Sequence, residues 1–192
     1  MKCVSNLKNV QTAMLGFSQD NSGRLPWQLT SSGVRAHVDA AATAADGYGA
    51  AAGGDNLTKA HGNVTATAAG SYGIAAMKSE LQTPKILLSP LDQANAANSE
   101  VAQENWAGYN TKTNDSANSE LAAGTSYAVC RGADSLRGAT VVALTRNNDR
   151  NSINNSRWYG ANENNANAAQ IISGLNKSEG QIATFDGGAK QS

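Results

Sequence analysis

The chain has 192 residues, in which 15 lysines and arginines balance 15 aspartates and glutamates for a formal net charge of +0. This length suffices for one domain with its own core, and the balanced charge argues against nucleic acid as a partner. Charged residues make up 16 % and aromatic residues 5 %. A surface that is uncharged but rich in hydrogen-bonding groups fits an extracytoplasmic protein better than a typical cytosolic enzyme.

Residues 2–20 predict one amphipathic helix. Apolar residues recur at every third or fourth position, which is typical of a helix with one buried face. The predicted packing face consists of Val4, Leu7, Val10, Met14 and Phe17. Gln11 is among the polar residues expected off this face. The polar run 20–23 ends in a glycine, and Pro26 opposes continuation, so the helix is expected to end there. The chain opens inside this helix without an N-cap, which predicts that the helix is the second part of a longer one.

Residues 28–70 form a low-complexity region with few large apolar residues. We interpret this region as a long surface insertion. Its two histidines, His37 and His61, are expected to be solvated rather than to bind a metal. The glycine-rich run 47–54 lacks the preceding strand and the spacing of a dinucleotide-binding loop, so a linker is the favoured interpretation.

Shorter elements are expected after this region. Apolar residues at helical spacing predict a helix over 72–82 that ends before Pro84. The apolar run 85–88 predicts a buried strand. Residues 91–106 predict another helix, with Asp92 as its N-cap.

Three strands are predicted in the second half of the chain, at 126–130, 139–145 and 181–185. The middle one is the strongest, because it is rich in β-branched residues and flanked by turns. Asp186 and Gly187 predict a tight hairpin turn after the third strand. A long helix followed by short mixed elements and an antiparallel C-terminal set indicates an α+β fold.

The two cysteines, Cys3 and Cys130, allow two states. A disulfide between them would close a long loop and stabilise the fold by roughly 4 kcal/mol on the loop-entropy model. Alternatively, both remain reduced and pack as small apolar side chains. Sequence separation fixes no geometry, and the reduced state is favoured.

Several segments carry a resemblance to a known family. The opening C-V-S-N-L-K-N-V-Q-T-A-M, with D-N-S-G-R-L-P after it, resembles the segment that follows the membrane span of prepilin-type proteins. These are the type II secretion pseudopilin and type IV pilin relatives of planctomycete and verrucomicrobial lineages. Residues 81–92 resemble that family's strand and Cys-Pro-x-Asp turn, with Ser89 in place of the cysteine. Residues 124–134 and 140–147 resemble its strands.

The C-terminus resembles the family motif written H-x9-D-G. Asp186 and Gly187 match the last two positions, whereas Asn176 occupies the histidine position. The turn is therefore expected to be retained without the group that the histidine supplies.

The resemblance implies a pilin-like fold, in which a long N-terminal amphipathic helix packs on a small antiparallel sheet with long irregular loops. Residues 1–192 would form one globular domain. Within it, 1–22 would be the C-terminal half of the helix, 28–70 the insertion and 71–192 the mixed helices and strands. The transmembrane half of the helix would precede the chain.

The function that the resemblance implies is structural. The chain would be a subunit of a type II secretion pseudopilus or a type IV-like filament involved in protein export. Its partners would be other pilin-like subunits. It would be anchored in the inner membrane and face the periplasm or the cell exterior.

Calcium is a candidate ligand, since the resemblance implies that major pseudopilins bind it in a C-terminal loop. Asn147, Asp149 and Asn151 stand at alternate positions of a loop, as oxygen ligands do. No glycine follows at the sixth place, and Trp158 stands where the twelfth-place glutamate of a calcium loop would be. A solvated asparagine-rich loop is therefore favoured.

An enzyme is not expected, because the chain has no H-E-x-x-H, C-x-x-C or G-x-S-x-G pattern. The alternative to a filament subunit is an extracytoplasmic module that binds carbohydrate or another exported substrate through its Asn- and Gly-rich loops. A concave cluster of asparagines with Trp27, Trp106 and Trp158 would indicate that function, whereas core packing explains these tryptophans equally well.

Overall fold

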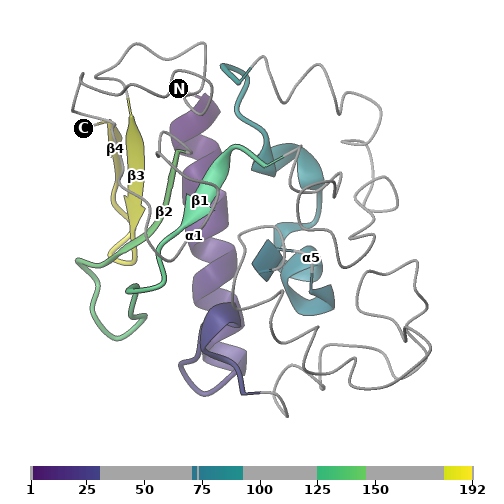
Figure 1. Ribbon diagram of the computed structural model, residues 1–192, viewed down its shortest axis with the longest axis vertical. Coiled ribbons are helices and arrows are strands. Elements are labelled where there is room, and N and C mark those ends of the chain that lie inside the picture. The colour runs from purple at the N-terminus through teal and green to yellow at the C-terminus, as the bar shows by residue number, and fades with distance from the viewer. Residues whose placement is uncertain (1, 31–70, 73, 93–124, 146–179, 192) are drawn as a thin grey trace, which may run out of the picture.

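The computed structural model describes residues 2–30, 71–72, 74–92, 125–145 and 180–191. Its elements in chain order are α1 (Lys2–Asp20), η1 (Pro26–Gln28), α5 (Ala75–Leu81), η3 (Pro84–Leu87), β1 (Tyr127–Val129), β2 (Val141–Thr145), β3 (Gln181–Thr184) and β4 (Ala189–Gln191). The four strands form one sheet in the order β1-β2-β3-β4, and all neighbours are antiparallel. One long helix packed on this small sheet makes an α+β fold, as predicted (Figure 1).

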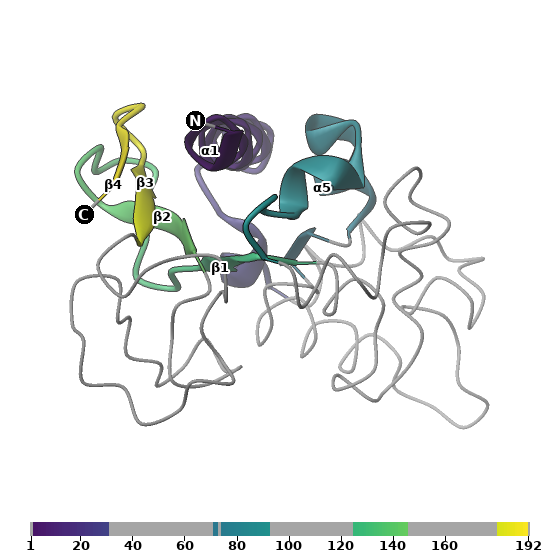
Figure 2. The same cartoon turned by 90° about the horizontal axis from the view of Figure 1, so that it is seen from above.

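Helix α1 lies between two groups of elements. It contacts β2, β3 and β4 on one flank and α5 and η3 on the other. Figure 2 shows α1 end on, with the sheet to one side and α5 to the other. Because two flanks are covered, the buried arc of α1 is wider than a single apolar stripe would be.

The predicted packing face of α1 is largely buried. Leu7, Val10, Met14 and Phe17 are at most 1 % exposed, whereas Val4 at the edge of the face is half-buried. The expectation that Gln11 lies off the buried face was wrong, because this residue is only 6 % exposed. Its amide donates to the carbonyl of Phe185 over 3.4 Å, so the buried position is satisfied by the backbone beyond β3.

The end of α1 follows the prediction. The helix stops at Asp20, and Ser22 and Gly23 both adopt positive φ, 57° and 81°. The amide of Gly23 then donates to the carbonyl of Ser18 over 2.7 Å. This bond satisfies one of the carbonyls that a helix end leaves without an intrahelical partner. Pro26 opens the short η1 helix that follows.

The apolar run 85–88 does not form a strand, so that prediction was wrong. Pro84 to Leu87 form the 3-10 helix η3. Proline fixes a φ suited to the first helical position, and the hydroxyl of Thr83 accepts from the amide of Lys85 over 3.4 Å. Both leucines at 87 and 88 are buried all the same. Burial of consecutive apolar residues therefore did not distinguish a strand from a short helix here.

The three predicted strands are present, and α5 lies inside the predicted helix 72–82. A row of small side chains runs across the sheet at the register positions of Val129, Ala143, Ala183 and Ala189. The first three are buried in the same core as Leu7 and Met14 of α1, and Ala189 packs at its edge. Three methyl side chains in the row allow the backbone of α1 to approach the sheet closely.

Enlarging this row is expected to destabilise the fold. Ala183→Leu should lower the free energy of unfolding by about 2 kcal/mol, because a fully buried position leaves no room for three more carbons. Urea unfolding followed by circular dichroism measures the change. Ala139→Leu, at an exposed position before β2, is the matched control. Equal stability of the two variants would contradict close packing of α1 on this row.

Candidate functional site

The first turns of α1 are fastened to the segment after η3. The thiol of Cys3 lies 2.9 Å from the hydroxyl of Ser89, and both side chains are buried. One turn later the amide of Asn6 donates to the carbonyl of Leu88 over 3.1 Å. These two polar contacts hold the N-terminal half of α1 in place beside the apolar contacts of the core.

The segment that contacts the start of α1 is itself a turn, at residues 89–92. The amide of Asp92 donates to the carbonyl of Ser89 over 3.0 Å, and the amide of Leu91 donates to the Ser89 hydroxyl over 3.2 Å. The carboxylate of Asp92 is fully buried and accepts from the hydroxyl of Ser126 over 2.7 Å. Asp92 therefore fastens this turn to the residue before β1. The helix predicted over 91–106 lies outside the described residues beyond Asp92.

The two cysteines are not bonded to each other, so the disulfide alternative is corrected in favour of two free thiols. Cys3 faces Ser89, whereas Cys130 follows β1 and packs at the edge of the core. Burial raises the pKa of the Cys130 thiol from 9.0 to about 11. A thiol with this pKa is almost wholly protonated at neutral pH and is a poor nucleophile.

Two tyrosines lie in the core. Tyr72 and Tyr127 are fully buried, and neither hydroxyl has a hydrogen-bond partner in the described part of the chain. Burial raises the pKa of both phenols well above the ordinary value, and the Cys130 thiol adds to the effect at Tyr72. The Tyr127 hydroxyl lies beside Cys3, Asn6 and Ser89 without good hydrogen-bond geometry to any of them. These groups are suited to packing rather than to proton transfer at neutral pH.

The Asp186–Gly187 turn is present between β3 and β4. Gly187 has a φ of 85°, which favours glycine. The Asp186 carboxylate accepts from the amide of Gly188 over 3.0 Å and from the hydroxyl of Thr184 over 2.5 Å. The amide of Asp186 donates to the carbonyl of Gly138 over 2.8 Å, which docks the hairpin on the connection before β2. Asp186 therefore acts as a turn former, whereas Asn176 lies outside the described residues.

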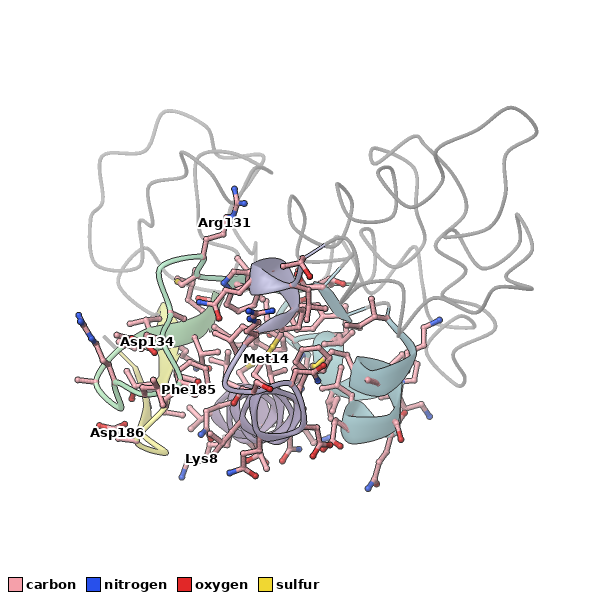
Figure 3. All side chains as sticks on the ribbon, turned by 90° about the horizontal axis from the view of Figure 1, so that it is seen from below. Lys8, Met14, Arg131, Asp134, Phe185 and Asp186 are labelled. Carbon is pink, nitrogen blue, oxygen red and sulfur yellow. The ribbon has the colours of Figure 1, made fainter. Side chains whose placement is uncertain are left out.

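One long side of α1 remains exposed. We call it the outer strip; its exposed residues are Lys2, Ser5, Lys8, Asn9, Thr12 and Gln19. Figure 3 shows Lys8 at the outside of α1 and Met14 toward the middle of the molecule. Half-buried Gly16 continues this side, and the carboxylate of Glu80 from α5 lies over it. The strip is polar along its whole length.

Sequence reasoning did not single out Gly16 and Glu80. A glycine inside a helix lowers the free energy of unfolding by about 1 kcal/mol relative to alanine. Gly16 was therefore a signal that the space of a side chain is needed by another group close to the helix. The group itself comes from a helix more than 60 positions away in the chain and could not be identified from sequence spacing.

The predicted calcium ligands Asn147, Asp149 and Asn151 lie outside the described residues, as do both histidines, Trp106 and Trp158. Within the described ranges, no group of three or more His, Cys, Asp or Glu side chains is placed to hold a metal ion. Trp27 is buried, and its indole donates to the carbonyl of Arg131 over 3.2 Å, so it belongs to the core.

Comparison with protein-family models, with curated proteins and with solved structures finds no match to this chain. In the part of the chain that the structure describes, no helix has both the length and the apolar character needed to span a membrane.

The contact between Cys3 and Ser89 predicts an engineered crosslink. Ser89→Cys should form a disulfide with Cys3 under oxidising conditions, because the two side-chain tips already lie 2.9 Å apart. The loop closed in this way spans 86 positions and should add about 4.5 kcal/mol to the free energy of unfolding on the loop-entropy model.

Non-reducing electrophoresis, thiol titration and thermal unfolding measure the bond and its effect. Ser89→Ala is the control that removes the hydroxyl without adding a thiol. Free thiols at both positions after oxidation of the folded Ser89→Cys variant would show that this contact is misplaced.

The buried phenol and thiol predict a loss of stability at alkaline pH. Cys130 and Tyr72 ionise near 9.0 and 10.0 when unfolded, but in the folded chain burial raises both pKa values. The contribution of these two groups to stability is therefore constant below pH 9 and is lost as pH rises from 9 toward 11 and beyond, because the unfolded state releases their protons first.

Tyr72→Phe should raise the midpoint of alkaline unfolding and leave the free energy of unfolding at pH 7 equal or higher, since its hydroxyl has no described partner. Urea unfolding at pH 7 and an alkaline titration followed by circular dichroism check both effects. A loss above about 1 kcal/mol at pH 7 would mean that the hydroxyl is hydrogen-bonded.

Proposed function

We propose that this chain is the displayed domain of a pilin-like structural subunit, which assembles with similar subunits into a type II secretion pseudopilus or a type IV-like filament. One observation carries the proposal: an N-terminal helix is fastened along two flanks to an antiparallel sheet and to α5 and yet keeps one polar side open from Lys2 to Gln19. That is the arrangement expected of a helix that continues into an anchor at one end and contacts neighbours along its length.

The contacts of α1 support this role. Polar bonds from Cys3 and Asn6 and apolar burial from Leu7 to Phe17 fix the helix to the domain over nearly its whole length. A pull on the N-terminal end of α1 would therefore be transmitted to the sheet and to the Ser89–Asp92 turn together. A subunit held in a filament by its N-terminal helix requires such a rigid link.

Two segments that carry the resemblance form turns in this fold, which supports the proposal. The segment like the Cys-Pro-x-Asp turn lies against the start of α1, and the Asp-Gly turn joins the last two strands. Under this proposal, the helix upstream of Lys2 anchors the subunit in the inner membrane, and the domain faces the periplasm or the cell exterior. Copies joined head to tail build an open filament.

The alternative of a carbohydrate- or substrate-binding module has less support. It required tryptophans gathered with asparagines on a concave surface, but Trp27 is buried in the core with its indole donating to a backbone carbonyl. An enzyme would require convergent acid–base groups, and the buried thiol and phenols described above hold their protons at neutral pH.

The coding sequence upstream of Lys2 gives the first test. A filament subunit requires a short basic leader, a prepilin cleavage site and an apolar run of about 20 residues there. A cytosolic start without an apolar run would contradict the proposal.

Assembly gives the second test. Thr12→Arg places a long charged side chain in the middle of the outer strip and should abolish filaments sheared from cells that express the complete gene, without changing thermal unfolding of the domain. Ala139→Arg, at an exposed position away from α1, is the matched control and should assemble normally. Wild-type protein that stays monomeric in its own membranes, with the export machinery intact, would contradict the function.

A further inference from the structure

Glu80 occupies an unusual position on the outer strip. A side chain at Gly16 would place its Cβ 2.8 Å from the Glu80 Oε2 atom and 3.3 Å from the carboxyl carbon. The glycine therefore leaves the space in which the carboxylate lies against the backbone of α1. Glu80 reaches this place from the last turn of α5, although its side chain remains exposed.

The carboxylate has no cationic partner within the described part of the chain. The salt bridge formed there joins Arg137 to Asp134 over 3.4 Å, in the connection between β1 and β2. Lys78 and Lys85 flank Glu80 in sequence, but neither makes an ion pair with it. An exposed carboxylate without a cationic partner among the described residues is accessible to a cation from another molecule.

The cations of the outer strip lie at its other end. Lys2 and Lys8 are exposed on the first two turns of α1, and neither is in an ion pair with a described residue. Lys8 precedes Gly16 by eight residues, or about 12 Å along a helix axis. Lys8 is thus displaced along the helix from the carboxylate of its own chain, and the strip is basic at one end and acidic toward the other.

We propose that Glu80 of one subunit pairs with Lys8 of the next copy of this chain, so that this contact fixes the axial register of neighbouring helices. The occupant of the outer strip is a second copy, because its charges complement those of the strip when it is shifted along α1 by about 12 Å. The lysine and the glutamate lie on different patches, so the contact is heterologous, and in the proposed filament it repeats from one subunit to the next. This inference rests on the proposed filament function and names the residues that would set its register.

Charge reversal tests the pairing. Lys8→Glu and Glu80→Lys are made singly and together in the complete gene, and filament yield is measured after shearing from cells. Each single variant should lose at least about tenfold in yield, because it places like charges together in the contact. The double variant should recover most of the wild-type yield, since the pair is restored with its signs exchanged.

Controls separate the pairing from other effects. Lys85→Glu makes the same charge change on the exposed side of η3 and should not alter the yield. Thermal unfolding of each variant domain should match that of the wild type, because Lys8 and Glu80 are both exposed. An equal loss in Lys85→Glu would show that net charge rather than the pair governs assembly, which would overturn the pairing.

The outcomes also separate this inference from the proposed function. Wild-type chains that never assemble would refute the filament function itself. Wild-type filaments with unchanged yield in the single variants, or with no recovery in the double variant, would overturn the Lys8–Glu80 pairing alone. A second double variant, Lys8→Glu with Asp20→Lys, changes a carboxylate in the last turn of α1 instead of Glu80. Recovery of the filament yield in this variant would also overturn the pairing, because it would identify Asp20 as the partner of Lys8.

Discussion

The packing of α1 between the sheet and α5 is the constraint on which the other contacts depend. Burying Leu7, Val10, Met14 and Phe17 contributes roughly 1.5 to 3 kcal/mol each, and no other described element supplies so many large side chains to the common core. For α1 to pack closely on the sheet while α5 covers its other flank, the side chains of the sheet beneath it must be small. The alanines at register positions of β2, β3 and β4 meet that requirement. The packing of α1 therefore accounts for the small side chains of the sheet.

Two further long-range hydrogen bonds join elements of the core. Asp92 and Ser126 meet over 2.7 Å, and the Thr145 hydroxyl accepts from the amide of Gln181 over 3.1 Å. The turn after η3 is thus bonded to the residue before β1, and the end of β2 is bonded to the start of β3.

The sequence predicted the structure correctly where a local preference of the chain decides the conformation. The rhythm of α1, the β-branched run of β2 and the Asp186–Gly187 turn each reflect a local preference, and each appears where predicted. The sequence prediction failed where a tertiary contact or a neighbouring proline decides the burial or conformation of a residue. Gln11 is buried because α1 has a second flank, and residues 84–87 turn as a 3-10 helix because Pro84 opens them. The contacts of Cys3 with Ser89 and of Gly16 with Glu80 are tertiary, so no local pattern contains them.

The division of α1 into apolar flanks and a polar strip restricts the kind of contact that a neighbour can make. Since Leu7, Val10, Met14 and Phe17 are buried within one chain, little hydrophobic driving force remains for association through the outer strip. Charges and hydrogen bonds must then select the partner and its register, and such contacts are individually weak and weakened by salt. Under the proposed function, assembly therefore depends on many repeated contacts, or on an apolar anchor elsewhere. That consequence follows from the placement of side chains on one helix. A substitution of Lys8 or Glu80 would be repeated at every contact of the proposed filament, so that even an individually weak pair would affect the yield.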